Sequence, residues 1–126
     1  MDVSGVLYRL SKSKFRSSFH LTKKMKNYID EKGMDTVKKH TVDFIVKNIS
    51  DAYPKNDGKQ TPMKGHPTFI AMHACACCCR SCLYKWHHIE KGRELTRDEK
   101  NYIYKLLITW IEREYNKWKR RGRYLK

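Results

Sequence analysis

The stretch HACACCCRSCLYKWHH, residues 73–88, contains all five cysteines of this 126-residue chain and three of its six histidines. Cysteines gathered within eight positions cannot join distant loops as the disulfides of a secreted domain do. We therefore expect reduced thiols. Three interpretations follow: a metal site, a seam of small buried side chains, or a thiol redox centre. The density of cysteine, with histidine on both flanks, favours the metal site.

The backbone conformation of this stretch decides which ligands can meet. Apolar residues recur at intervals of three and four, and Pro67 suits the first turn of a helix, so one helix over residues 67–89 is expected. A helix turns by about 100° per residue. An unbroken helix therefore cannot direct Cys78, Cys82 and both flanking histidines towards one tetrahedral ion.

Two ligand arrangements remain open. In an unbroken helix, Cys78 and Cys82 can bind a soft metal if a distant histidine completes the shell. In a helix broken near residues 77–79, Cys79-x-x-Cys82 can chelate the ion together with a flanking histidine. A nucleobase deaminase is excluded, because its His-x-Glu motif and the proline before its Cys-x-x-Cys motif are missing. The distant histidines are His20, His40 and His66.

Patterns on both sides of the cysteines predict further helices. Thr96 and Glu99 form a capping box in front of a strong apolar stripe. Thr22 can cap a helix that ends at Gly33, and a second apolar stripe follows it. Runs of β-branched residues with period two are missing, so the predicted fold is all-α, a compact single domain of about four helices. These helices cover residues 23–32, 36–50, 67–89 and 97–120.

A long irregular loop, residues 51–66, separates the second and third expected helices. Its prolines and glycines are incompatible with regular structure. Lys59, Lys64 and His66 in this loop can meet a phosphate near the N-terminus of the following helix. The alternative is a capped connection, because the loop has the spacing of neither a P-loop nor a dinucleotide-binding turn.

The charge of the chain points to a polyanionic partner. Lysine and arginine number 28 against 13 acidic residues, a formal net charge of +15. Basic arms over about 1–20 and 117–126 are expected to flank a helical core over about 21–118. Such arms favour nucleic acid, DNA or RNA, with aromatic residues available to stack on bases. The candidate nucleic-acid-binding residues are Lys12, Lys14, Arg16, Lys23, Lys24, Lys59, Lys64, Arg80, Lys117, Lys119, Arg120, Arg121 and Arg123.

Other classes of function are weaker or remain open. No apolar stretch is long enough to cross a membrane and no secretory leader is visible, so we expect a cytoplasmic protein without a membrane partner. One alternative is a small metal-dependent enzyme, for example a nuclease, that uses the Cys/His cluster and the 56–66 loop. It lacks a paired-carboxylate signature for activating water. The other alternative is a phage or bacterial module that binds a protein partner.

Nine short segments between residues 56 and 92 form a recognisable pattern: NDGKQTPM, GHP, FIA, HA, CCR, CL, KWH, I and KG. On this pattern the chain resembles a family of short bacterial and phage proteins described only as a domain of unknown function, over about Phe19 to Tyr115. The resemblance implies no activity. Cys75 and Cys77 stand where other members have threonine, which argues against them as ligands. Zinc is the expected metal, because it accepts mixed Cys/His shells. The expected ligands, all at matching positions, are His73, Cys78, Cys79, Cys82 and His87.

Overall fold

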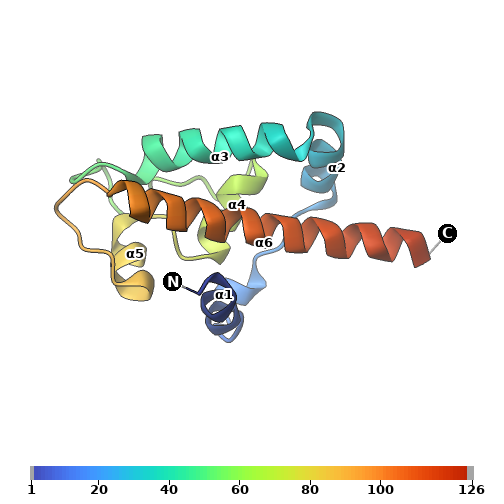
Figure 1. Ribbon diagram of the computed structural model, residues 1–126, viewed down its shortest axis with the longest axis horizontal. Helices are drawn as coiled ribbons and strands as arrows, with labels where there is room; N and C mark the ends of the chain where they lie inside the picture. Colours follow the sequence, from blue (N-terminus) through green and yellow to red (C-terminus); the bar gives the residue numbers. More distant parts are fainter. Residues whose placement is uncertain (1, 125–126) are drawn as a thin grey trace.

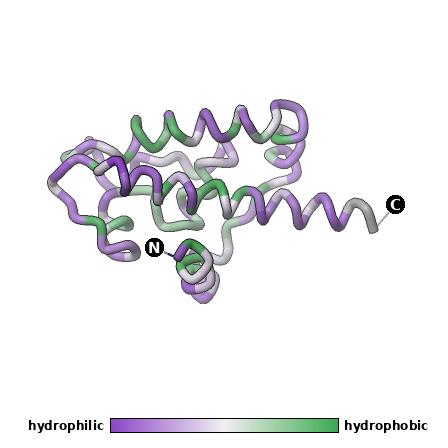
Figure 2. The backbone as a smooth tube through the Cα atoms, in the orientation of Figure 1, coloured by the Kyte–Doolittle hydropathy of each residue, from purple (hydrophilic) through white to green (hydrophobic). Residues whose placement is uncertain are grey.

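The C-terminal helix α6 (Arg97–Tyr124) is the element on which much of the domain packs. The computed structural model describes residues 2–124, and side chains up to residue 121. Helices α1, α3 and α4 all contact α6, and the C-terminal half of α6 extends beyond them (Figure 1). Figure 2 shows that this extension is largely hydrophilic. The basic tail predicted over 117–126 thus continues a folded helix through residue 124.

The described residues form helices and turns, and no strand occurs among them. The all-α class is therefore confirmed, although six α-helices are present where the sequence predicts about four. Residues 50–66 contain no helix, as expected for the long loop. One hydrophobic core cluster links the helices. The elements are α1 (Val3–Ser11), the 3₁₀ turn η1 (Arg16–Ser18), α2 (Lys23–Lys32), α3 (Met34–Ile49), α4 (Pro67–Ala74), α5 (Arg80–His87) and α6.

The N-terminal segment belongs to the core, and the prediction of a basic arm outside it is wrong. Val3, Leu7 and Leu10 are buried on one face of α1, which packs against α6. Asp2 caps this helix by accepting a hydrogen bond from the Ser4 amide at 3.1 Å. The spacing of four and three residues between the apolar positions is that of an amphipathic helix. Ser4, Tyr8 and Arg9 are exposed on its other side, and the basic residues that follow the helix obscure the pattern.

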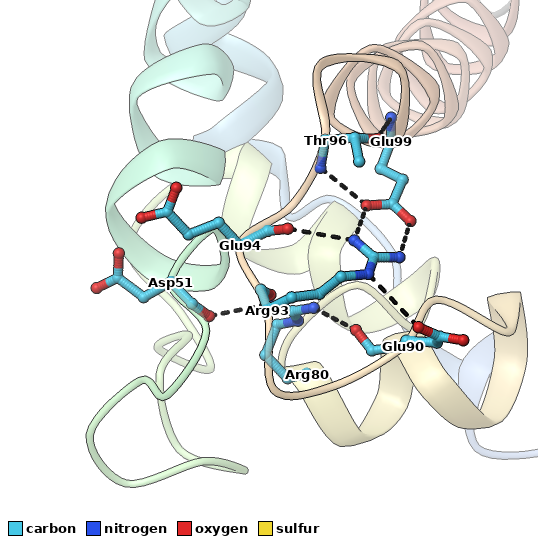
Figure 3. Close-up of polar contacts among 7 residues, drawn as sticks. All are labelled: Asp51, Arg80, Glu90, Arg93, Glu94, Thr96 and Glu99. Atoms are coloured by element: carbon cyan, nitrogen blue, oxygen red, sulfur yellow. Dashed lines mark hydrogen bonds and ion pairs between the residues drawn. The ribbon is translucent and has the colours of Figure 1, made fainter.

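Three predicted helix ends are confirmed by their caps. The Thr22 hydroxyl accepts a hydrogen bond from the Met25 amide at 3.2 Å, which begins α2. Gly33 has φ +88° and separates α2 from α3, a conformation that other residues rarely adopt. At the start of α6, the amides of Thr96 and Glu99 each donate to the other residue's side chain, at 2.8 and 3.1 Å. Figure 3 includes this capping box.

The expected single helix over 67–89 is broken into α4 and α5. Helix α4 ends in a Schellman motif: the Cys77 amide donates to the Met72 carbonyl at 2.8 Å, and the Ala76 amide donates to the His73 carbonyl at 3.3 Å. Ala76 takes the left-handed conformation, with φ +56°. Glycine is the usual residue at this position. Because alanine stands here instead, the sequence gives no sign of the break, and the apolar periodicity continues across it.

A buried arginine fixes the start of α5. Arg80 is only 1% exposed and donates hydrogen bonds to the carbonyls of Asp51, Arg93 and Glu90, at 2.8, 2.8 and 2.6 Å (Figure 3). It thus joins the end of α3 to the segment that leads into α6. In the same segment, Arg93 forms two hydrogen bonds of 2.7 Å with the Glu99 carboxylate.

Among the described residues, no helix is long and apolar enough to cross a membrane.

Candidate metal centre

Three cysteines around the first turn of α5 bring their sulfur atoms together. The Sγ atoms of Cys78, Cys79 and Cys82 all lie within 4.8 Å of one another, and those of Cys78 and Cys82 are 3.6 Å apart. Sulfurs bound tetrahedrally to zinc at about 2.3 Å stand roughly 3.8 Å from one another. The three thiols can therefore hold a metal ion after only small side-chain movements.

The break between α4 and α5 is what gathers these sulfurs. Cys79 is the N-cap residue of α5, with extended backbone, and its Sγ accepts a hydrogen bond from the Cys82 amide at 3.3 Å. Cys78 lies one residue before the cap, and its carbonyl accepts a hydrogen bond from the Thr61 hydroxyl at 2.7 Å. The arrangement corresponds to the broken-helix alternative, in which Cys79-x-x-Cys82 forms a chelating turn.

A buried arginine from the N-terminal segment faces the sulfurs. Arg16 is 8% exposed and donates hydrogen bonds to Cys82 Sγ at 3.2 Å, Cys78 Sγ at 3.7 Å and the His73 carbonyl at 2.7 Å. Within the described part of the chain, Arg16 forms no ion pair with a carboxylate. The guanidinium of Arg16 is thus satisfied by one carbonyl and two sulfurs, and its positive charge favours the thiolate form of the sulfurs it contacts.

The protonation of the three thiols follows from these contacts. Hydrogen bonds from Cys78 and Cys79, followed by the contacts with Arg16, hold the pKa of Cys82 well below its usual range despite burial. The pKa of Cys78 is raised by its hydrogen bonds to Cys79 and Cys82 and by burial. Burial also tends to lower the pKa of Arg16, but the bonds to sulfur outweigh it and the pKa is raised. These contacts favour Cys82 over Cys78 as the group that loses its proton first.

The two histidines expected as ligands do not join the sulfurs. Nε2 of His73 lies 3.1 Å from the carbonyl oxygens of both Thr61 and Pro62, so this ring is bound to the long loop. His87 places Nε2 2.8 Å from the Cys75 carbonyl and Nδ1 2.8 Å from the Tyr102 hydroxyl. Over residues 2–121, no histidine or carboxylate completes the group of three thiols.

Cys75 and Cys77 lie apart from this group. Both are fully buried, and burial raises the pKa of each thiol. The Cys77 sulfur lies 3.7 Å from His87 Nε2. These two cysteines therefore have the features of the packing seam that the sequence also suggests, and the five cysteines fall into two groups in space.

The long loop is anchored by its own polar side chains. Asp57 accepts hydrogen bonds from the Arg80 amide at 3.0 Å and the Ser81 hydroxyl at 2.5 Å, at the start of α5. Nδ1 of His66 accepts from the Thr68 amide at 3.0 Å, at the start of α4. The amides that a bound phosphate would need are thus already satisfied. The structure favours the capped connection over a phosphate-binding loop.

Comparison with known protein families agrees with the resemblance noted in the sequence. A family model described as "Domain of unknown function (DUF4186)" matches residues 4–112. The chain belongs to this family. The match begins at Ser4, within α1, so the N-terminal helix and Arg16 are part of the family domain. No solved structure gives a significant match to the chain.

The predicted nucleic-acid-binding residues of this DUF4186 chain have different environments. Arg16 and Arg80 are buried against sulfur and carbonyl groups, so we leave them out of any surface contact. Lys119 pairs with Asp30 at 2.8 Å, which ties α6 to α2. The side chain of Arg123 lies outside the described residues. The remaining candidates are exposed: Lys12, Lys14, Lys23, Lys24, Lys59, Lys64, Lys117, Arg120 and Arg121.

Arg16 of the DUF4186 domain is buried, so its prediction as a surface residue that binds nucleic acid is wrong, and Lys26 and Arg113 are basic residues that the prediction did not include. Nothing in the sequence alone separates Arg16 from its basic neighbours, because only the fold of α1 and η1 brings it to the sulfurs. Lys26 and Arg113 line hollows along α6, together with His20. Lys26 and Arg113 could be predicted as surface candidates only once α2 and α6 are known to be adjacent.

Proposed function

We propose that this protein binds one zinc ion through the thiolates of Cys78, Cys79 and Cys82. The observation that carries the proposal is the convergence of three sulfurs, within 4.8 Å of one another, on a buried arginine that has no carboxylate partner in the described chain. Soft thiolate ligands select zinc among the common divalent ions of the cell. A neutral fourth ligand, such as water, completes a tetrahedral shell.

Charge balance supports this ligand set. Three thiolates around one divalent ion leave a net charge of −1, which the guanidinium of Arg16 neutralises. Without the ion, two of the three thiols keep their protons and only Cys82 offsets Arg16, as the pKa shifts indicate. Binding of the metal therefore releases protons, and affinity falls as the pH is lowered.

A shell of three protein ligands and one water is typical of catalytic zinc, but the position of these sulfurs in the fold fits a structural role. The sulfurs lie where α4, α5, η1 and the long loop meet: Cys78 bonds to Thr61 of the loop, and Arg16 of η1 bonds to the carbonyl of His73 in α4. An ion held there fixes a break in the chain that local sequence preference does not favour. Removing it is expected to loosen α5 and the N-terminal segment together.

The test is metal analysis of protein purified without a histidine tag. Wild-type protein is expected to contain about one zinc per chain, and Cys82→Ser to contain little. Cys77→Ser is the matched control, because this buried cysteine lies outside the group of three and should keep the metal. Loss of zinc from both variants alike, or from neither, contradicts the ligand set.

We further propose that the protein binds nucleic acid. The supporting observation is the distribution of charge: Lys23 and Lys24 are exposed on α2, and Lys117, Arg120 and Arg121 are exposed on the C-terminal half of α6, whose end extends beyond the other helices. Lysine and arginine clustered in this way bind phosphates without needing a particular base sequence.

This proposal predicts binding that weakens steeply as salt is raised. Titration of labelled DNA and RNA over a salt series measures it, since the slope reports the number of phosphates contacted. Absence of binding at low salt contradicts the proposal. The metal-dependent enzyme has less support, because Asp57, His66 and His73 are each engaged in the hydrogen bonds of the loop.

A further inference from the structure

Three adjacent hollows lie along α6: the first is also lined by α1 and η1, the second by α2 and the residue His20 before it, and the third by α6 alone. Their volumes are about 260, 360 and 350 Å³, and all three are lined by Glu114 and Lys117. They therefore form one groove along α6, which we call the α6 groove. Each hollow is close in size to the lower end of small-molecule sites.

The α6 groove is strongly cationic. Its basic lining residues are Lys26, Arg113, Lys117, Arg120 and Arg121, and His20 lies beside them. Among the described residues, Glu114 is its one acidic lining group, and this carboxylate is 14% exposed. It accepts a hydrogen bond from the Leu21 amide at 3.1 Å and lies 3.2 Å from His20 Nδ1. Because Glu114 is engaged in holding the chain before α2, the groove presents mainly positive charge to a ligand.

An aromatic side chain is fixed within this charged surface. Trp118 is half-buried and lines the hollow between Lys26 and Arg121. The neighbouring turn of α6 is tied to α2, because the Tyr115 hydroxyl bonds to Asp30 and Lys119 pairs with the same carboxylate at 2.8 Å. The Lys119 ammonium lies 5.1 Å from the centroid of the Trp118 ring, so a stacked base has to use the opposite face of the indole or displace this lysine.

We propose that the α6 groove binds single-stranded nucleic acid, with one unpaired base stacked on Trp118 and the adjoining phosphates on Lys26, Lys117 and Arg121. Stacking on an aromatic ring between cationic side chains is the usual means of holding single strands without reading their sequence. A duplex keeps its base faces covered, so it can place phosphates on the groove but no base inside it. This inference rests on the nucleic-acid binding proposed above and adds the site and the form of the strand.

The experiment compares four labelled 12-nucleotide probes by fluorescence anisotropy, on full-length protein loaded with zinc. They are a mixed-sequence single strand, the same sequence as a duplex, the single strand with abasic sites throughout, and a single strand of RNA. The intact single strands are expected to bind at least about fivefold more tightly than the duplex and the abasic strand, given the usual contribution of stacking. The abasic probe separates stacking from charge without any change to the protein.

Variants then assign the interaction to residues. Trp118→Leu is expected to lose roughly 5- to 100-fold in affinity for the single strand and to leave abasic and duplex binding unchanged. Lys26→Ala and Lys117→Ala should each lower the salt slope by about one unit for every probe. The control is Lys47→Ala, because Lys47 is exposed on α3, outside the groove. It should change neither the affinity nor the salt slope. Thermal unfolding of each variant checks that the fold is retained.

The possible outcomes separate the two proposals. Equal binding of single strand and duplex, with no effect of Trp118→Leu, overturns the base-stacking site but leaves nucleic-acid binding standing. Absence of binding to all four probes overturns both. In a parallel sedimentation assay with phosphatidylserine vesicles, binding to the vesicles without binding to any nucleic-acid probe also overturns both, and assigns the α6 groove to an anionic membrane surface.

Discussion

Replacing Arg16 by methionine tests the charge balance of the cysteine cluster. Arg16 is 8% exposed and donates short hydrogen bonds to the His73 carbonyl at 2.7 Å and to Cys82 Sγ at 3.2 Å. A hydrogen bond that involves a charged group contributes roughly 1.5–3 kcal/mol. Loss of two such bonds, partly offset by the burial of the apolar methionine side chain, should lower the free energy of unfolding by about 3 kcal/mol.

The assay for this prediction is urea unfolding at pH 7 followed by circular dichroism, on zinc-loaded protein. Lys14→Met is the matched control, because Lys14 is exposed two residues earlier and its replacement should change stability by less than about 0.5 kcal/mol. Zinc affinity should also fall in Arg16→Met, since the anionic three-thiolate centre loses its neutralising cation. If the two variants unfold at the same urea concentration and bind zinc equally, the sulfurs carry no charge that Arg16 offsets, and the reasoning is refuted.

Three further predictions follow from other parts of the fold. Leu10→Ala should destabilise the protein by roughly 2–4 kcal/mol in urea unfolding, because Leu10 is 3% exposed in the core; a change below about 0.5 kcal/mol means that α1 is not packed on α6. Arg80→Met should cost about 3 kcal/mol or more, since it leaves three backbone carbonyls without their charged donor; unchanged stability would show that water serves these carbonyls equally well. The third prediction concerns His66. Burial, and after it the nearby charge of His40, lowers the pKa of His66 to about 4. As the pH falls below about 6.5, His66 takes up a proton in the unfolded chain but stays neutral in the folded chain. The free energy of unfolding therefore decreases between about pH 6.5 and 4, by at most about 3 kcal/mol. His66→Asn, which can still cap α4, should flatten this dependence, and an unaltered slope excludes His66 as its source.

Much of the fold is visible in the sequence where local signals agree. Three helix termini follow from the residue types at those positions, and the structure confirms all three. Thr22 begins α2, Gly33 ends it, and the capping box of Thr96 and Glu99 begins α6. The loop before α4 is equally clear from its prolines and glycines. These elements depend on contacts among neighbouring residues, which a sequence displays directly.

The rest depends on contacts between distant residues. Ala76 takes a left-handed conformation that usually belongs to glycine, so the apolar pattern gives no sign of the break that gathers the sulfurs. Arg16 has the same appearance in the sequence as its exposed neighbours, yet it lies 66 positions from its partner Cys82. His73 flanks the cysteines in the sequence but donates to the loop instead. The sequence therefore singled out the three cysteines whose sulfurs converge, but it also named His73 and His87, which lie elsewhere, and it did not identify Arg16 as a neighbour of the sulfurs.

The central claim is that the thiolates of Cys78, Cys79 and Cys82 hold one zinc ion. The most direct measurement is the number of zinc ions per chain in native protein, determined together with the thermal unfolding temperature before and after chelation. We predict one zinc per chain and a marked fall in unfolding temperature when the ion is removed. A zinc content well below one per chain, with unfolding unaffected by chelation, would contradict the claim and leave these cysteines as packing residues.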